Sequence, residues 1–482
     1  MNRKLLTVVF TLLILVGGIS FYAIFHDVKQ MEQEAVPAMS FAKDQEELVD
    51  NPEFEKIIRA YELISEKYVE EIDEKELLEG AIQGMLSALE DPYSVYMDKQ
   101  TTEQFTQSLG STFEGIGAEV GMNNGKIIII SPFKNSPAEK AGLKPNDEII
   151  AIDGKSIEGL NLHEAVLKIR GKKGTTVMIT VQRPGHTDPL QFKVKREQIP
   201  IKTVYSSLEK KKGKKIGIME ITSFSENTAK DFHEKLSELE KKKIDGLVID
   251  VRGNPGGYLQ SVEEILKQFI PKDKPYIHIE DRNGNRQSYF SDNKDKKPYP
   301  ITVLIDKGSA SASEILAGAM KEAGGYDIVG ETSFGKGTVQ QAIPMEDGSH
   351  IKLTLYKWLT PVGNWIHNKG VEPTVPVEQP EYFKAPPLQI KQVLKKDMNN
   401  EQVEIAQQLL SGLGFETGRN DGYFDENTEV AVTAFQQIHH LPITGEIDKQ
   451  TAFLLNEQVQ KERKSKDKDL QMQTAIQLLL NN

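Results

Sequence analysis

Three serines stand at alternate positions between an apolar run and an alanine-rich stretch. Residues 301–305 predict a buried strand, and residues 312–323 predict a helix. A serine in the tight turn between them exposes its hydroxyl at the helix N-terminus, where backbone amides and the helix dipole stabilise a developing oxyanion. Ser309, Ser311 and Ser313 are therefore candidate nucleophiles for acyl transfer. Serine is also a favoured helix cap, and this segment alone does not separate the two interpretations.

A second candidate for chemistry is Lys336, which stands between two glycines, 25 residues after Ser311. Withdrawal from water lowers the pKa of a lysine, and a neutral amine can accept a serine proton. Residues 330–336 also fit the first part of the phosphate loop G-x-x-x-x-G-K. However, Gly337 stands where that loop needs a hydroxyl for Mg²⁺, and Glu331 would repel phosphate. A nucleotide hydrolase is therefore a weak alternative.

The composition restricts the class of protein. A chain of 482 residues has room for about three domains. The formal net charge of −12 argues against nucleic acid as a partner, because general binding to it needs a basic surface. Cysteine is absent, which excludes a disulfide framework, a thiol nucleophile and cysteine-ligated metals. Nine histidines leave a Ser/His/Asp triad open, but none lies in a segment as suggestive as those of the serines and the lysine.

The N-terminus predicts the location of the protein. Arg3 and Lys4 precede an apolar run, Leu5–Phe25, which is long enough to span a bilayer as a helix. Positive charge before such a run keeps the start of the chain in the cytoplasm. We expect residues 1–28 to be an uncleaved anchor, with a removed signal segment and secretion as the alternative. The rest of the chain then lies on the extracytoplasmic face of the bacterial cytoplasmic membrane.

Changes in the apolar pattern divide the remaining chain. Residues 29–100 form a polar stalk followed by two helical runs that end before Pro92. We expect these helices, together with the charged and apolar tail at 457–482, to mediate homodimerisation. The apolar runs 216–221, 246–250 and 301–305 alternate with helical segments, which is typical of a buried α/β sheet.

A glycine-rich turn in residues 101–197 points to peptide binding. Two glycines within three residues let backbone N–H groups converge on one anion, and the residues concerned are Gly115, Ile116, Gly117 and Ala118. With the segments around 136–143 and 147–154, this order resembles a PDZ domain of the bacterial protease type. The resemblance implies that a partner's C-terminal carboxylate binds to these amides. The partner's last residues would add a strand beside 118–121 and against a helix at 162–170.

Several further motifs occur in one order, namely residues 250–257, 309–314 and 335–340. Together with the PDZ-like module they resemble the C-terminal processing peptidase family, with a protease core at 198–378. The resemblance implies that Ser311 is the nucleophile, Lys336 the general base and Gln340 the residue that orients the lysine. It also implies that the N–H groups of Gly257 and Ala312 hold the oxyanion, and that no metal or organic cofactor is used.

Four charged residues lie near these motifs. Asp250, Arg252 and Arg170 each have a structural and a functional interpretation, whereas Glu314 has a structural one only. Asp250 and Arg252 end a buried strand, as either a structural ion pair or a catalytic part. Glu314 falls in the first turn of a helix, where compensation of the helix dipole explains it. Arg170 ends the helix of the PDZ-like module, where a cation also suits the dipole. The alternative for Arg170 is that it docks this module onto the protease core and couples peptide binding to activity.

After a linker at 379–400, residues 401–456 resemble a small three-helix peptidoglycan-binding domain. Ile405, Leu409 and Phe435 are expected in its core. Asp421-Gly422 is a turn by its composition and part of the binding loop by the resemblance. Peptidoglycan is therefore a candidate partner, although such modules also serve as spacers.

The expected architecture is multidomain α/β and α+β. It combines a helical N-terminal segment, a β-rich PDZ-like module, a crotonase-like or ClpP-like α/β protease core and the three-helix module. The expected activity is that of a serine endopeptidase that recognises the free C-terminal tails of proteins or peptides and forms an acyl-enzyme. The alternative from a different class is a catalytically silent PDZ-type scaffold at the cell envelope.

Overall fold

The computed structural model describes residues 52–123, 125–183, 186, 188–463, 465 and 467–481. The apolar run at 5–25 lies outside these residues. Within the described ranges, no helix has both the length and the apolar character needed to cross a membrane. The chain forms two compact units, Met1–Ala88 and Leu89–Asn482.

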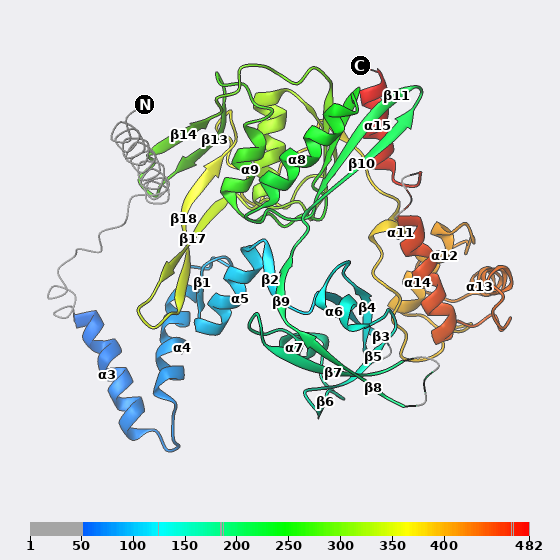
Figure 1. Cartoon of the computed structure of the whole chain (residues 1–482), viewed down its shortest axis with the longest axis horizontal. Coiled ribbons are helices and arrows are strands. Elements are labelled where there is room, and N and C mark those ends of the chain that lie inside the picture. The colour runs from blue at the N-terminus through cyan, green and yellow to red at the C-terminus, as the bar shows by residue number, and fades with distance from the viewer. Residues whose placement is uncertain are drawn as a thin grey trace, which may run out of the picture. The chain divides into compact units, whose positions relative to one another are not determined.

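The first unit contains the predicted pair of helices, α3 (Pro52–Lys67) and α4 (Glu74–Ser87) (Figure 1). Asp73 begins α4 by accepting the N–H groups of Lys75 and Glu76. Several large apolar side chains of this pair are exposed to 40% or more, namely Phe54, Ile57, Ile58, Leu63, Ile64, Leu78 and Met85. The amphipathic helices therefore leave apolar surface uncovered by the unit itself.

The PDZ-like module is a β-rich layer with two helices. Its elements are β2 (Thr112–Gly115), β3 (Ala118–Asn123), β4 (Lys126–Pro132), α6 (Pro137–Ala141), β5 (Glu148–Ile152), β6 (Lys155–Ser156), α7 (Leu162–Ile169), β7 (Thr176–Gln182), β8 (Leu190–Lys195) and β9 (Glu197–Pro200). The main sheet has the order β3-β4-β5-β7-β8, so that β3 is an edge strand, and α7 contacts it. The strand predicted at 118–121 and the helix predicted at 162–170 are confirmed.

The protease core is built on a six-stranded sheet with the order β10-β11-β12-β15-β16-β19, parallel except for β10. Its elements are β10 (Val204–Lys211), β11 (Lys214–Ile221), α8 (Thr228–Lys241), β12 (Gly246–Asp250), α9 (Leu259–Leu266), β15 (Ile301–Ile305), α10 (Ala312–Ala319), the π-helical turn η1 (Met320–Gly324), β16 (Asp327–Gly330), β19 (Val375–Pro376) and α15 (Leu470–Asn481). The continuous apolar runs predicted as buried strands are β11, β12 and β15.

Both faces of this sheet are covered, which explains the nearly continuous apolar runs within its central strands β11, β12 and β15. Leu247 and Ile249 point into one core with side chains of α8, α9 and α10. Val248, on the other face of the same strand, packs with Ile476 and Leu479 of α15. The expectation that the apolar tail serves dimerisation is therefore wrong for its buried face, because that face covers the sheet of its own chain.

A second sheet, in which every strand pair is antiparallel, lies beside the core and was not predicted. Its elements are β1 (Val95–Met97), β13 (Pro275–Glu280), β14 (Arg286–Phe290), β17 (Thr338–Pro344) and β18 (His350–Leu359), with α5 (Lys99–Leu109) following β1. β17 begins two residues after Lys336 and pairs with β18, with a register shift between Val339 and Gln340. The lysine segment is thereby attached to this sheet.

The helical module has a hydrophobic core of its own. It consists of α11 (Glu381–Lys384), α12 (Glu401–Gly412), α13 (Glu426–Ile438) and α14 (Lys449–Arg463). Ile405, Leu409 and Phe435 are all buried there, as predicted. Both ends of the module lead back to the protease core, through β19 on one side and α15 on the other.

Candidate active site

Ser311 lies in a strained turn between β15 and α10. Its φ of 54° and ψ of −113° fall in a region that non-glycine residues rarely occupy. Such a conformation costs on the order of 1–3 kcal/mol and persists only where its surroundings enforce it. The turn brings a partly exposed serine to the N-terminus of a buried helix, which is the geometry of a nucleophile.

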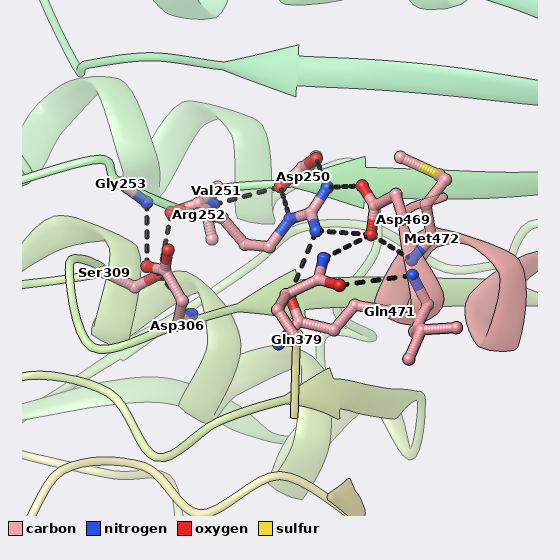
Figure 2. A network of polar contacts seen from close by, with 11 residues as sticks. Asp250, Val251, Arg252, Gly253, Asp306, Ser309, Gln379, Asp469, Gln471 and Met472 are labelled. Carbon is pink, nitrogen blue, oxygen red and sulfur yellow. Dashed lines mark hydrogen bonds and ion pairs between the residues drawn. The ribbon is translucent and has the colours of Figure 1, made fainter. Parts of the chain in front are cut away.

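The flanking serines are excluded as nucleophiles by their burial and their hydrogen bonds. Ser309 and Ser313 are fully buried. The hydroxyl of Ser309 donates to the backbone carbonyl of Val251 at 2.8 Å (Figure 2), and that of Ser313 donates to the carbonyl of Asn254 at 2.9 Å. Both side chains thus fasten the Ser311 turn to the segment 251–258, which we call the oxyanion loop.

The oxyanion loop presents Gly257 beside this turn. At a φ of 142°, a Cβ on Gly257 would lie 2.0 Å from the carbonyl oxygen of Phe224, so only glycine fits there. Among the described residues, no group accepts the N–H of Gly257. The N–H of Ala312 belongs to the first residue of α10 and has no partner within the helix. Both amides expected from the sequence are therefore free to bind an oxyanion.

Asn254 connects the loop to the turn. This fully buried side chain donates from Nδ2 to the carbonyl of Ile221 at the end of β11 and accepts the N–H of Gly256. Its own carbonyl accepts the N–H of Ala310 at 3.0 Å. The loop and the nucleophile turn are thereby held as one unit, as oxyanion stabilisation requires.

Lys336 lies in a half-buried position with a lowered pKa. Burial is the largest cause and the positive charge of Lys352 adds to it, while Asp91 and Glu314 oppose it, and the resulting pKa of Lys336 is about 8. The Nζ atom lies 4.6 Å from the centroid of the Tyr93 ring, a cation–π contact. A lysine with this pKa is partly neutral near pH 8 and can act as a base.

Glu314 has a larger role than its sequence position indicates. The side chain is fully buried. Its Oε2 accepts the backbone N–H of Ser311 and that of Lys336, each at 2.8 Å, and its Oε1 accepts the Ser333 hydroxyl and the Gly335 N–H, each at 2.6 Å. The expectation that dipole compensation alone explains Glu314 is wrong, because one carboxylate joins the serine turn to the lysine loop.

The chain's two tryptophans fix the same lysine loop from the other side. The indole N–H of Trp358 donates to the carbonyl of Lys336 and that of Trp365 donates to the carbonyl of Gly337, both at 2.8 Å. The backbone of the lysine loop is therefore fixed by hydrogen bonds at both its N–H and its C=O groups. Nothing in the local sequence marks either tryptophan as part of this arrangement.

Ser311 and Lys336 are joined through their backbones, whereas the side chains of Lys336 and Gln340 contact other residues. Among the residues described, no hydrogen bond links Lys336 Nζ to Ser311 Oγ. Gln340, expected to orient the lysine, donates from Nε2 to the hydroxyls of Thr338 and Thr354, both at 3.0 Å. Asp250 and Arg252 form the structural ion pair that was one of their two interpretations.

In the PDZ-like module, the glycine turn joins β2 to the edge strand β3. A Cβ on Gly117, whose φ is 71°, would lie 2.6 Å from the Cβ of Ser136. The carbonyls of Ile116 and Gly117 accept the N–H groups of Ala138 and Phe133, whereas their own N–H groups have no acceptor in the described part of the module. The guanidinium of Arg170 lies 5.1 Å from the centroid of the Phe113 ring, which belongs to the adjoining strand β2.

In the helical module, the loop at Asp421-Gly422 is folded against α12. Arg419 pairs with Asp421 and lies 4.9 Å from the centroid of the Tyr423 ring, whose hydroxyl donates to Asp397. The exposed Asp421 has a pKa lowered to about 2, mainly by its hydrogen bonds from Arg419. This arrangement presents charged and aromatic groups at one surface.

Four family profiles match consecutive parts of the chain. Peptidase family S41 matches residues 215–377, the PDZ domain matches 115–195 and a peptidoglycan binding domain matches 399–455. Residues 14–101 match the N-terminal domain of the activating protease CtpB. The fold and the nucleophile turn thus define a serine protease that carries a PDZ domain and a peptidoglycan-binding domain.

Comparison with individual proteins narrows this class. The chain is 60% identical over the full length of both chains to the carboxy-terminal processing protease CtpB of Bacillus subtilis (strain 168). It is 42% identical to CtpA of the same organism, over 88% of this chain and 90% of CtpA. A solved photosystem II D1 C-terminal processing protease is 26% identical, with a TM-score of 0.42 over 68% of this chain and 94% of that one. The chain belongs to peptidase family S41, among the carboxy-terminal processing serine proteases.

Proposed function

We propose that the chain is an extracytoplasmic serine endopeptidase that cleaves exported or membrane-associated proteins near exposed C-terminal tails. In this proposal Ser311 is the nucleophile and Lys336 the general base. The observation that carries the proposal is the shared bonding of Glu314, which joins the strained turn of Ser311 to the loop of Lys336. Gly257 and Ala312 complete the site with two amides suited to an oxyanion.

The reaction is an acyl transfer in two halves. A neutral Lys336 takes the Oγ proton of Ser311 while Oγ bonds to the scissile carbonyl carbon, and the oxyanion is held by the N–H groups of Gly257 and Ala312. The C–N bond then breaks and the leaving amine takes the proton from Lys336. In the second half, Lys336 takes a proton from water while the water oxygen bonds to the acyl carbon. The bond between that carbon and Oγ of Ser311 then breaks, and Oγ takes the proton from Lys336.

The cation–π contact with Tyr93 fits a resting position of Lys336. Because the ring attracts the ammonium and not the neutral amine, deprotonation weakens that contact. We therefore expect the neutral amine to turn toward Ser311, where Gln340 at the start of β17 would orient it. The strand β17 is well placed for this role, since its first residue follows Lys336 by two positions.

The PDZ domain would supply substrate recognition. The free N–H groups of Ile116 and Gly117 suit a terminal carboxylate, and the edge strand β3 can accept an added strand next to α7. Peptide binding would then gate activity, with Arg170 as the coupling residue. If Arg170→Ala leaves both peptide binding and turnover unchanged, this coupling role is wrong.

Location, wall binding and assembly are further parts of the proposal. The apolar run at Leu5–Phe25 supports a single membrane anchor or a secretion signal.

The surface around Asp421 and Tyr423 supports contact with peptidoglycan. Retention of the protein on purified cell wall would test this contact, with Tyr423→Ala as the comparison. The uncovered apolar side chains of α3 and α4 support homodimerisation, and a monomeric mass in light scattering at micromolar concentration would exclude it.

The decisive experiment is cleavage of a fluorogenic peptide with a free C-terminus. We expect wild type and the control Lys369→Ala, an exposed lysine, to cleave it. Ser311→Ala and Lys336→Ala should bind the peptide without cleaving it. Binding without cleavage by the wild type would support the scaffold alternative instead.

A further inference from the structure

The last helix of the chain is part of the protease core. Its buried side chains Met472, Ala475, Ile476 and Leu479 pack on the sheet face formed by Ile216, Ile218, Val248, Leu304 and Val329. α15 contacts β12 and β15. β12 leads into the oxyanion loop and β15 leads into the Ser311 turn. The tail therefore packs on both strands that carry the candidate active site.

Asp469, directly before α15, forms an ion pair with Arg252 (Figure 2). Its Oδ2 accepts from Nη2 of Arg252 at 2.7 Å and its Oδ1 accepts from Nη1 at 2.9 Å. Gln471 Oε1 accepts a further bond from Nη1 at 3.0 Å. The exposed fractions are only 16% for the Arg252 side chain and 13% for that of Asp469, so the pair is largely withdrawn from water.

Arg252 is held between two carboxylates. Asp250 accepts from its Nε at 2.9 Å and from its Nη2 at 2.7 Å. Burial alone would raise the pKa of Asp469, but the hydrogen bonds and charge of Arg252 outweigh burial and keep that pKa below its ordinary value. Removal of one member of such a group leaves the other charges buried and poorly compensated.

Arg252 is the second residue of the oxyanion loop. The residue after it, Gly253, donates its N–H to Asp306 Oδ1 at 2.8 Å (Figure 2). Asp306 directly follows β15 and also accepts the N–H of Gly308. Ser309 bonds to Val251 on the other side of Arg252. The position of Arg252 therefore sets where the loop to Gly257 starts, five residues before the oxyanion amide.

The two ends of the helical module meet at the same ion pair. Gln379, just after β19, donates from Nε2 to Asp469 Oδ1 at 2.6 Å and accepts the N–H of Leu470 at 3.2 Å. Gln471 donates to the carbonyl of Val377 at 2.9 Å. The module is thus an insertion between β19 and α15, and Asp469 closes it onto the oxyanion loop.

We propose that Asp469 is a positioning residue of the protease, which acts through Arg252 to hold the oxyanion loop in place. The inference rests on the proposed roles of Ser311 and Gly257. Since a misplacement of about 1 Å can lower a rate by about 100-fold, loss of this anchor should reduce turnover and leave substrate binding in the PDZ domain intact. The site would then depend on a side chain 217 positions from Arg252.

The test compares Asp469→Asn with Asp467→Asn, an exposed aspartate two positions earlier. On a fluorogenic peptide, we expect Asp469→Asn to lower kcat at least about tenfold with KM within about twofold, and Asp467→Asn to match wild type. Asp469→Glu, which keeps the charge, should recover part of kcat. Equal kcat values for Asp469→Asn and Asp467→Asn would overturn the proposal.

A second measurement separates positioning from a general loss of structure. In an Arg252→Gln background, adding Asp469→Asn should lower kcat no further, because the effect passes through Arg252. An equal loss in both backgrounds would overturn the proposal. If Asp469→Asn does not fold, the same comparison is made with Asp469→Glu. Failure of the proposed function itself is distinct, since wild type would then cleave no faster than Ser311→Ala.

Discussion

The backbone N–H groups of Ser311 and Lys336 donate to the same oxygen, Oε2 of Glu314, at 2.8 Å each. The two residues are 25 positions apart, yet one buried carboxylate fixes the distance between their backbones. The same bond helps to hold Ser311 at its positive φ. The strain of the nucleophile turn is therefore balanced by a charge-assisted hydrogen bond to a residue of the adjoining helix.

Replacement of Glu314 by alanine should destabilise the protein strongly. Three backbone N–H groups and the Ser333 hydroxyl lose their buried acceptor, at about 1–3 kcal/mol for each donor left unsatisfied. We expect the free energy of unfolding to fall by about 3 kcal/mol or more, measured by urea denaturation. The exposed Glu346→Ala should change it by less than about 0.5 kcal/mol. A similar small change for Glu314→Ala would contradict the joining role.

Glu314→Gln tests the charge of the same residue. The carboxylate favours the ammonium form of Lys336, so its neutralisation should lower the pKa of Lys336. Activity that needs the neutral amine rises with pH through that pKa. The acidic limb of log kcat/KM against pH should therefore move to lower pH, and an unmoved limb would show that Glu314 does not act on the lysine.

Lys352→Met should produce the opposite shift. The positive charge of Lys352, a half-buried residue of β18, disfavours the ammonium of Lys336. Without it the pKa of Lys336 rises from about 8, and kcat/KM at pH 7 should fall by roughly three- to tenfold, with recovery at higher pH. A loss of activity that is equal at all pH values would exclude the electrostatic explanation.

Gly117→Ala should impair peptide binding by the PDZ domain. A Cβ there would clash with Ser136, whereas the matched control Gly154→Ala has a similar positive φ of 76° and open space around it. Both variants are strained by about 1–2 kcal/mol. Only Gly117→Ala should lose at least about tenfold in affinity for a peptide with a free C-terminus, measured by fluorescence anisotropy. Equal affinities would place the carboxylate elsewhere.

The sequence predicted the candidate catalytic residues better than the tertiary contacts that hold them in place. The strand, serine turn and helix around Ser311 follow from local pattern, and so does the glycine-flanked Lys336. The choice of Ser311 over Ser309 and Ser313 could not be made from the sequence. It depends on the tertiary hydrogen bonds by which the hydroxyls of Ser309 and Ser313 are bound to the oxyanion loop. Tyr93 and Lys352 act on Lys336 through tertiary contacts, for which the single sequence carries no signal.

For the fold, too, local patterns were predicted and long-range contacts were not. Apolar runs such as 246–250 indicated strands buried on both faces, but the pattern did not say what covers the second face. The tail at 470–481 supplies that cover, and its apolar spacing fits both packing within the chain and association between chains. The second sheet was missed although residues 350–355 of β18 alternate between polar and apolar side chains, as a half-buried strand does. Its assembly depends on the pairing of β18 with β1, β13 and β17, which are long-range contacts that the single sequence does not show.

In the proposed reaction, the amine of Lys336 takes the proton of Ser311. The most direct measurement is the rate at which a fluorophosphonate labels Ser311 as a function of pH, in wild type and in Lys336→Met. We expect labelling of the wild type to rise with a midpoint near pH 8, and Lys336→Met to be labelled at least about 100-fold more slowly over the whole range. Equal labelling rates in the two proteins, or a wild-type rate independent of pH, would contradict it.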